Sequence, residues 1–184
     1  KLRFPQANRQ GVIYASRGLN RDLIENLFSG QYIGLHQSVI LQGFTGSGKT
    51  YLACALGKEA CLNHVRVRYV RLPDLLMEYG DSTVVSGNQR KLLERYSRIP
   101  LLILDGWLVS DISDAELHFL FELMERRSDT TSTIFCTQYR KDDWVKRLGE
   151  GVRAEAIVDR YAYTAFWIET GSTNMREYCA KHKR

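Results

Sequence analysis

Residues 43–50, Gly-Phe-Thr-Gly-Ser-Gly-Lys-Thr, place three glycines, a lysine and a hydroxyl group in the spacing GxxxxGK[ST]. Glycines allow successive backbone N–H groups to turn inward around phosphate oxygens. A lysine in this position reaches the β- and γ-phosphates, and the hydroxyl group that follows ligates Mg²⁺. The segment therefore predicts a nucleotide-binding phosphate loop. The alternative is a flexible glycine-rich turn that contains a lysine by chance.

The surroundings of this segment favour the phosphate loop. Residues 38–43 have the pattern of a short buried strand, and residues 51–64 have that of a helix with Leu52, Leu56 and Ala60 on one face. A helix that begins at the loop adds a partial positive charge toward the phosphates. The residues expected to bind the nucleotide are Gly43, Thr45, Gly46, Ser47, Gly48, Lys49, Thr50 and Tyr51.

Asp105 is the expected partner of the loop, because it ends the wholly apolar run 101–105. Such a run is typical of a central parallel strand that is buried on both faces. Its terminal carboxylate would face the loop and hold Mg²⁺ together with Thr50. A polar strand end without a metal is the alternative. A phosphate-hydrolysing enzyme is expected to carry a second acid next, but Gly106 follows Asp105.

The remaining chain alternates strands and helices, which predicts an α/β fold with a mainly parallel sheet covered on both sides. Residues 65–71 alternate in period two, and 132–138 and 164–170 are further strand-like runs. Helices are predicted at 72–80, 87–98, 113–127, 141–149 and 155–161, with Ser113 and Glu116 forming a capping box.

Composition bounds the partners and the environment. The 184 residues suit one domain, and the net charge of +5 with an isoelectric point of about 9.1 favours an anionic partner. The four cysteines form no CxxC pair and are expected to be buried, reduced thiols of a cytoplasmic protein. No apolar run approaches the roughly 20 residues of a membrane span, so no membrane partner is expected. Because no Met opens the chain, we expect an N-terminal part to be missing.

Several segments together resemble AAA+ ATPases of the IstB/DnaC type, which are transposition helpers and helicase loaders. They are the phosphate loop followed by TYLACALGKEAC, the strands LLILDGW and STIFCTQ, and the late motifs IVDRY and NMREY. The resemblance runs from residue 15 to the tail and is closer to the IstB-like helpers. It implies a three-layer αβα P-loop NTPase with an AAA+ core, a single ATP-binding domain over 1–184, and ATP with Mg²⁺ as cofactors.

The resemblance also implies roles for residues outside the loop. Thr137 would position the attacking water, Arg160 would act on the nucleotide of a neighbouring copy, and Arg176 would contact the nucleotide of its own chain. The alternatives are a local backbone hydrogen bond for Thr137, an ion pair with Asp159 or a solvated helix end for Arg160, and a solvated tail for Arg176. Residues 16–19 would line the adenine pocket.

Related proteins usually carry Asp or Glu where Gly106 stands. Three explanations remain open: hydrolysis is slow and ATP acts as a switch; Asp111 or Asp114 replaces the missing base; or the water is positioned without a side-chain base. A base contributes roughly 10²–10⁴-fold, and phosphoryl transfer depends largely on positioning and charge. We therefore expect intact nucleotide binding and weak hydrolysis.

DNA is the expected anionic partner, bound mainly through its backbone and hence sensitive to salt. The candidate residues lie between the second strand and Asp105 and are Arg68, Arg71, Arg90, Lys91, Arg95 and Arg98, with Tyr79 and Tyr96 interleaved. The alternative is a solvated helix face paired with Glu78 and Glu94.

Four functions follow from these features. The first is an ATP-dependent helper that oligomerises on DNA and recruits or regulates a transposase. The second is a DnaC-like loader of a replicative helicase. A small-molecule kinase is the third, although no arginine-rich lid is found. The fourth is an ATP-binding module with a purely structural role. This function remains a candidate because Gly106 replaces the second acid.

Overall fold

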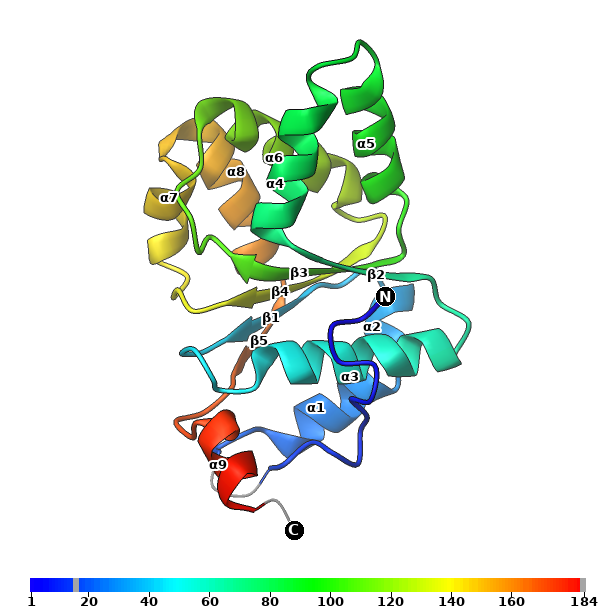
Figure 1. The fold of residues 1–184 in the computed structure, drawn as a ribbon, viewed down its shortest axis with the longest axis vertical. Helices are drawn as coiled ribbons and strands as arrows, with labels where there is room; N and C mark the ends of the chain where they lie inside the picture. The colour runs from blue at the N-terminus through cyan, green and yellow to red at the C-terminus, as the bar shows by residue number, and fades with distance from the viewer. Residues whose placement is uncertain (15–16, 183–184) are drawn as a thin grey trace.

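The computed structural model describes residues 1–14 and 17–182, which form a sheet between two layers of helices (Figure 1). The strands are β1 (Val39–Gln42), β2 (Val67–Arg71), β3 (Leu101–Trp107), β4 (Ser132–Thr137) and β5 (Phe166–Glu169). Their order is β2-β3-β4-β1-β5, and every pair is parallel. The predicted α/β fold with three αβα layers is therefore confirmed.

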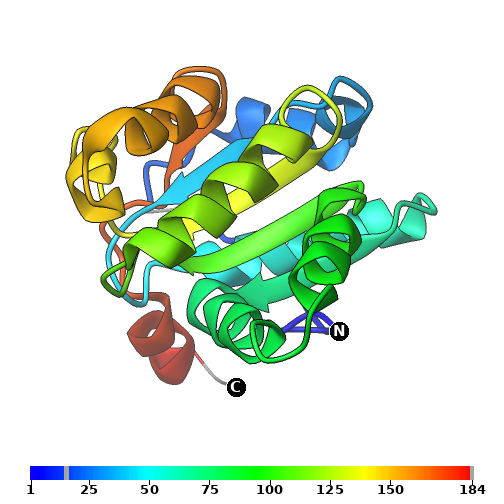
Figure 2. The same ribbon diagram turned by 90° about the horizontal axis from the view of Figure 1, so that it is seen from above.

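The helices divide between the two faces of the sheet. The face below the sheet in Figure 1 carries α1 (Arg21–Phe28), α2 (Gln31–Gly34) and α3 (Lys49–Leu62). The opposite face carries α4 (Leu72–Ser82), α5 (Asn88–Ser97), α6 (Asp114–Arg127), α7 (Asp143–Leu148) and α8 (Gly151–Ala162), and Figure 2 shows this layer from above. The last helix, α9 (Met175–Lys181), follows β5 and lies beside the start of α3.

Alternation along β3 explains why both layers are needed. Leu102 and Leu104 point into one hydrophobic core, and Leu101 and Ile103 point into the other. All four side chains are fully buried. A strand that is apolar on both faces must be covered on both faces, because exposed apolar area costs about 25 cal/mol per Å².

Most of the predicted elements are found, with differences at their ends and in the cysteines. The capping box of Ser113 and Glu116 begins α6 as predicted. Helices α1, α2 and α9 were not predicted, because they are short or lie in polar segments. The expectation that the cysteines are buried holds for Cys54 and Cys136. It is wrong for Cys61 of α3 and Cys179 of α9, which are both exposed.

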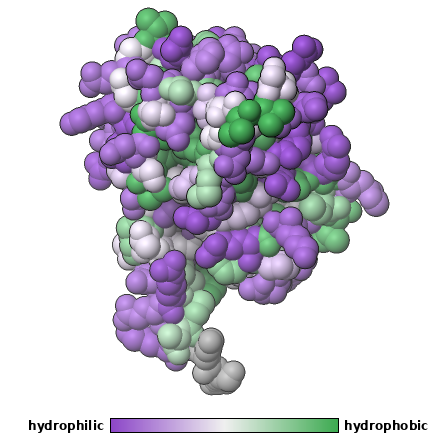
Figure 3. All heavy atoms as spheres, turned by 45° about the horizontal axis from the view of Figure 1, so that its top comes forward, coloured by the Kyte–Doolittle hydropathy of each residue, from purple (hydrophilic) through white to green (hydrophobic). Residues whose placement is uncertain are grey.

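Within residues 1–14 and 17–182, no helix has the length and apolar character needed to cross a bilayer. On the face shown in Figure 3, hydrophilic side chains cover most of the surface and hydrophobic ones appear in small separate groups.

Arg127, at the end of α6, is a fully buried cation whose bonds join three elements. Its guanidinium donates to the backbone oxygens of Tyr96 at 2.7 Å, Ile99 at 2.9 Å and Ser132 at 2.6 Å, and to the hydroxyl of Thr133 at 3.0 Å. Burial lowers the pKa of Arg127 to about 10. The side chain satisfies the carbonyls at the end of α5 and fixes that end against β3 and β4.

We predict that Arg127→Met lowers the free energy of unfolding by more than about 2 kcal/mol, because several buried carbonyls lose their donor at once. Urea denaturation measures the change. Arg126→Met is the matched control, since Arg126 is the preceding residue of α6 and only forms an exposed pair with Glu122 at 3.9 Å. Its effect should stay within about 0.5 kcal/mol. Equal losses in the two variants would contradict this role of Arg127.

Candidate nucleotide site

The glycine-rich loop lies where the sequence places it, between the carboxyl end of β1 and the first residue of α3, Lys49. In a parallel sheet, this edge is where ligands bind. The loop backbone requires its glycines. Gly46 has φ +96° and Gly48 has φ +91°, and residues other than glycine rarely adopt such backbone angles. A Cβ at Gly46 would lie 2.7 Å from Asn174 Oδ1, so a larger residue would have to displace the Asn174 side chain.

Arg17 clamps the loop to the end of β5. Its Nη2 donates to the backbone oxygens of Ser47 at 2.5 Å and Thr170 at 3.1 Å, and the side chain is 5% exposed. Ser47 and Thr170 also share a hydrogen bond of 2.6 Å between their hydroxyls, while Thr170 Oγ1 donates to the Gln42 carbonyl at 3.0 Å. The Ser47 side chain therefore holds the loop in place and does not face a ligand.

Lys49 lies inside the loop. Its Nζ donates to the carbonyls of Gly43 at 2.7 Å and Phe44 at 2.8 Å. Burial lowers the pKa of Lys49, and the neighbouring Arg176 lowers it further, whereas Cys136 and Asp105 act in the opposite direction. Arg176 and Lys49 also line the same pocket. Two cations at one loop fit the several negative charges of a triphosphate.

Asp105 accepts hydrogen bonds from three elements. Thr50 Oγ1 donates to its Oδ2 at 3.0 Å, Tyr69 Oη donates to the same oxygen at 2.6 Å, and the N–H of Gly106 donates to Oδ1 at 2.9 Å. Burial, with the hydrogen bond to Asp105 next, raises the pKa of Tyr69. The Thr50 hydroxyl and the Asp105 carboxylate are therefore brought together as predicted for a magnesium site.

A pocket of about 390 Å³ opens beside the loop. Its polar side includes Lys49, Thr50 and Arg176, and its apolar side includes Phe4, Ile13 and Met175. The full lining is Arg3, Phe4, Gly11, Ile13, Arg17, Gly46, Gly48, Lys49, Thr50, Tyr51, Met175, Arg176 and Cys179. A pocket lined by both phosphate-binding groups and apolar residues fits a nucleoside triphosphate.

The predicted adenine segment 16–19 is only partly described. Ser16 lies outside the described residues, Arg17 lines the pocket, Gly18 lines a neighbouring hollow, and Leu19 is buried in the core. The apolar wall comes instead from the N-terminal segment and from α9. Tyr51, by contrast, lines the pocket as expected.

Thr137 makes local hydrogen bonds to the backbone, which was the alternative to a role in positioning water. Its Oγ1 donates to the Trp107 carbonyl at 3.1 Å and accepts from the N–H of Tyr139 at 3.1 Å, and the side chain is 1% exposed. The next residue, Gln138, is exposed and accepts a hydrogen bond from Thr45 of the loop at 3.4 Å. Gln138 is thus the amide at the end of β4 that reaches the loop.

Arg160 is not among the described residues that line the pocket of its own chain. It lies at the end of α8, where its guanidinium pairs with Glu125 at 2.8 Å. The paired acid is therefore Glu125 of α6, and not the Asp159 of the alternative.

Gly106 occupies a bulge, because the pairing of β3 with β4 shifts between Asp105 and Trp107. Its φ is +68°, and a Cβ would meet only Val109 at 3.5 Å and Pro73 at 4.0 Å. A side chain therefore fits, but the backbone conformation favours glycine. Of the proposed replacement acids, Asp111 points to solvent and pairs with Arg147 at 3.3 Å, and Asp114 is exposed at the start of α6.

The basic residues proposed for DNA separate into two groups. Arg68, Lys91 and Arg95 line a groove between β2 and α5, and so does Arg98. Arg71 pairs with Asp74 at 3.5 Å, and Arg90 pairs with Glu94 at 3.0 Å. The pair with Glu94 agrees with the alternative of a solvated helix face. The expectation of aromatic contacts is wrong for Tyr96, whose side chain is fully buried, and Tyr79 is stacked on Phe119 at 4.5 Å.

Three residues of the site were not found from the sequence: Tyr69, Gln138 and the clamp function of Arg17. Tyr69 lies on a strand next to β3, so its contact with Asp105 depends on strand order. Gln138 could have been found, because it directly follows the strand beside Asp105 and carries a polar side chain. Arg17 acts across 153 residues of sequence to Thr170, and no local pattern indicates that contact.

Comparison with known proteins agrees with this geometry. A family described as IstB-like ATP binding protein matches residues 4–183. The chain belongs to this family. A putative insertion sequence ATP-binding protein of Sinorhizobium fredii, y4uH, is 32% identical over 176 residues, covering 96% of this chain and 71% of the relative. The insertion sequence IS21 putative ATP-binding protein of Pseudomonas aeruginosa is 32% identical, covering 87% of this chain and 61% of that relative.

Solved structures confirm the fold of this IstB-like chain. The DnaC helicase loader matches with a TM-score of 0.77 at 22% identity, covering 91% of this chain and 98% of that one. AMPPCP-bound DnaA from Aquifex aeolicus matches with a TM-score of 0.78 at 18% identity, covering 97% and 56% respectively. The chain is therefore an ATP-binding protein with the fold of these P-loop ATPases.

We predict that Mg-ATP raises the melting temperature of the wild-type chain and leaves that of Lys49→Ala nearly unchanged. At a ligand concentration of 100 Kd, binding contributes about 2.7 kcal/mol. Lys58→Ala is the matched control, because Lys58 is a lysine of the same helix and does not line the pocket. A thermal shift of Lys49→Ala equal to that of Lys58→Ala would contradict the assignment.

Proposed function

We propose that this IstB-like chain is a cytoplasmic transposition helper that binds Mg-ATP, assembles on DNA, and recruits or regulates a transposase. The proposal is carried by a pocket lined by Lys49, Thr50 and Arg176, with Asp105 bonded to Thr50, in a chain whose relatives are named as insertion sequence proteins. A DnaC-like helicase loader is the second candidate, supported by the likeness in fold to the DnaC helicase loader.

In this proposal, the chain's own residues bind and orient the nucleotide. Loop N–H groups and Lys49 hold the β- and γ-phosphates, and Arg176 adds positive charge from α9. Thr50 and Asp105 would hold Mg²⁺, which supplies charge neutralisation at the phosphates. Gln138 and Tyr69 position the groups around it, the first at the loop and the second at Asp105. The proposed domain is the whole of residues 1–184.

Hydrolysis is proposed to be weak, because Gly106 supplies no base and Asp111 is held by Arg147. We predict that Gly106→Asp raises phosphate release from Mg-ATP by roughly tenfold or more, since a positioned base contributes about 10²–10⁴-fold. The same change lowers the free energy of unfolding by about 1 kcal/mol, because Asp replaces Gly at a positive φ. Gly106→Asn is the control, as it imposes similar strain without a carboxylate. Equal rates for the two variants would overturn the proposal.

We propose that Arg160 of one copy completes the nucleotide site of a neighbouring copy. Arg160 is not among the described residues that line the pocket of its own chain. Arg160→Ala and Lys49→Ala should each release phosphate more slowly than the wild type. Mixing them should restore part of the activity, because the intact loop of one variant then meets the intact Arg160 of the other. Activity that stays at the level of the separate variants at every mixing ratio would exclude a role in trans.

The partner is tested by capture. Immobilised chain with Mg-ATP and duplex DNA is mixed with a purified transposase or a purified replicative helicase. Retention of the transposase alone supports the helper, and retention of the helicase alone supports the loader.

A further inference from the structure

A groove of about 520 Å³ lies between the edge strand β2 and helix α5. Five cationic residues line it, and one acid, Glu94, does so as well. The cations are Arg66, Arg68, Lys91, Arg95 and Arg98, and the neutral members of the lining are Val67, Tyr96 and Ile99. Because Glu94 is paired with Arg90, which does not line the groove, its charge is already partly balanced. The groove therefore presents a concentrated positive charge.

The cations of the groove differ in their partners. In the part of the chain that the structure describes, no ion pair is found for Arg66, Lys91 or Arg98, and all three residues are exposed. Arg66 only donates to the carbonyl of Arg98, at 3.3 Å. Unpaired cations along one groove are available to phosphate oxygens without first breaking an internal ion pair.

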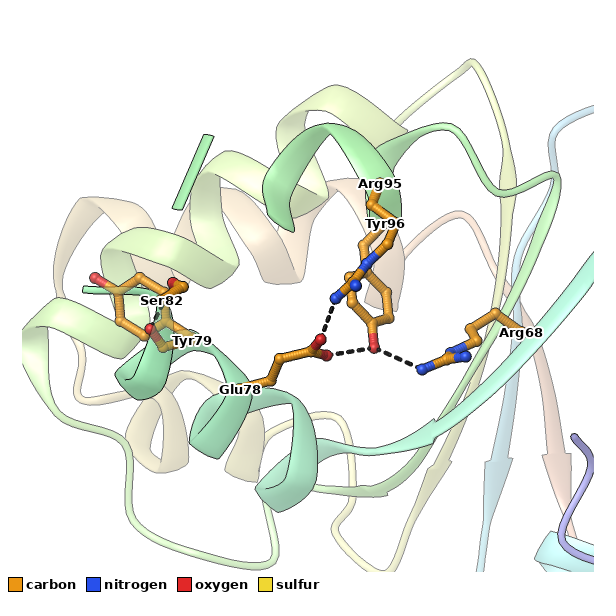
Figure 4. A network of polar contacts seen from close by, with 6 residues as sticks. All are labelled: Arg68, Glu78, Tyr79, Ser82, Arg95 and Tyr96. Carbon is orange, nitrogen blue, oxygen red and sulfur yellow. Dashed lines mark hydrogen bonds and ion pairs between the residues drawn. The ribbon is translucent and has the colours of Figure 1, made fainter. Parts of the chain in front are cut away.

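The other two cations belong to a network around Glu78, shown in Figure 4. Arg95 forms an ion pair with Glu78 Oε1, and Tyr96 Oη donates to Glu78 Oε2 at 2.8 Å. Arg68 in turn donates to Tyr96 Oη at 3.4 Å, and both guanidiniums lie over the Tyr96 ring, at 5.8 Å for Arg68 and 5.1 Å for Arg95. The carboxylate of Glu78, in α4, thus accepts hydrogen bonds from Arg95 and Tyr96. A phosphate group in the groove would need these same donors.

The lining indicates what kind of contact the groove makes. Its aromatic residue, Tyr96, is fully buried beneath the two arginines and offers no face for a base to stack on. Proteins that bind single strands typically combine cations with exposed aromatic rings, whereas contacts to a duplex backbone need cations alone. Charge without a stacking surface therefore fits the phosphates of a duplex.

We infer that the groove between β2 and α5 binds the phosphate backbone of duplex DNA through Arg66, Lys91 and Arg98, and that Glu78 limits this binding by holding Arg95. The inference rests on the proposed assembly on DNA and names the surface that performs it. Arg66 and Arg98 precede β2 and β3, so the groove lies toward the amino ends of these strands, away from the phosphate loop. DNA and nucleotide can therefore bind at the same time.

One groove covers few phosphates, since protein–DNA modules usually bury roughly 600–1,000 Å². A single copy is expected to bind weakly. Several copies joined through their ATP sites gain affinity because each further contact is then intramolecular. The groove should bind DNA without ATP, and ATP should raise the apparent affinity.

The test uses the whole chain and a fluorescent 30-base-pair duplex of mixed sequence, titrated by anisotropy at 50–200 mM NaCl without nucleotide. The groove variant carries Arg66→Gln, Lys91→Gln and Arg98→Gln. The matched control carries Lys58→Gln, Lys146→Gln and Arg153→Gln, which remove the same charge from positions outside the groove. We expect the groove variant to bind at least about tenfold more weakly, with the slope of log K against log salt reduced by about 3.

The control should keep most of the wild-type affinity, and both variants should keep the thermal shift with Mg-ATP, which shows that they are folded. Equal affinities of the groove variant and the wild type, or equal losses in the two triple variants, would overturn the groove while leaving DNA binding intact. Absence of binding by the wild type at 50 mM NaCl, with and without ATP, would instead overturn the proposed assembly on DNA.

A second variant tests Glu78 by gain of affinity. Glu78→Gln should tighten duplex binding several-fold and steepen the salt slope by about 1, because Arg95 becomes available. Asp74→Asn removes an acid from the same helix, one that pairs with Arg71 outside the groove, and should change binding little. A Glu78→Gln affinity equal to or below that of Asp74→Asn would show that Glu78 only supports the fold.

Discussion

The carboxylate of Asp105 is the point on which the nucleotide site depends. It ends the central strand β3 and receives donors from α3 through Thr50, from the edge strand β2 through Tyr69, and from its own following residue. A half-buried carboxylate of this kind is stabilised only while its donors stay in place. The start of the phosphate-loop helix and the end of two strands are therefore fixed relative to one another by a single side chain. The loop, in turn, is held from the other side by Arg17.

Local sequence patterns were sufficient to predict those features of the protein that are formed by residues close together in the chain. The phosphate loop, the buried strand 101–105 and the capping box of α6 each follow from residues within a few positions of one another. The contacts of Tyr69, Arg17 and Arg127 could not be predicted, because they depend on which strands and helix ends become neighbours. The unpredicted α9 forms one wall of the nucleotide pocket although its sequence is polar. Burial of Tyr96 was missed for a similar reason, since its ring is covered by arginines from β2 and α5.

The two charged regions of the molecule lie on different elements but share a support. The nucleotide site is built on β1, α3 and the end of β3, and the basic groove is built on β2 and α5. Arg127 satisfies the carbonyls at the end of α5 and bonds to the first residues of β4, the strand that lies between β3 and β1. The groove therefore rests on the same sheet that carries the phosphate loop, without sharing a side chain with it.

Helix α9 is joined to the phosphate loop by few contacts. The N–H of Met175 donates to the carbonyl of Gly46 at 2.8 Å, and none of the side chains of α9 is buried. A wall attached this lightly opens more easily than the sheet behind it, since local opening has a lower free energy where few groups are buried. Displacement of this one short helix would therefore widen the nucleotide pocket without disturbing the sheet. In the proposed assembly, a protein or DNA that touches α9 would therefore change how long the nucleotide stays bound.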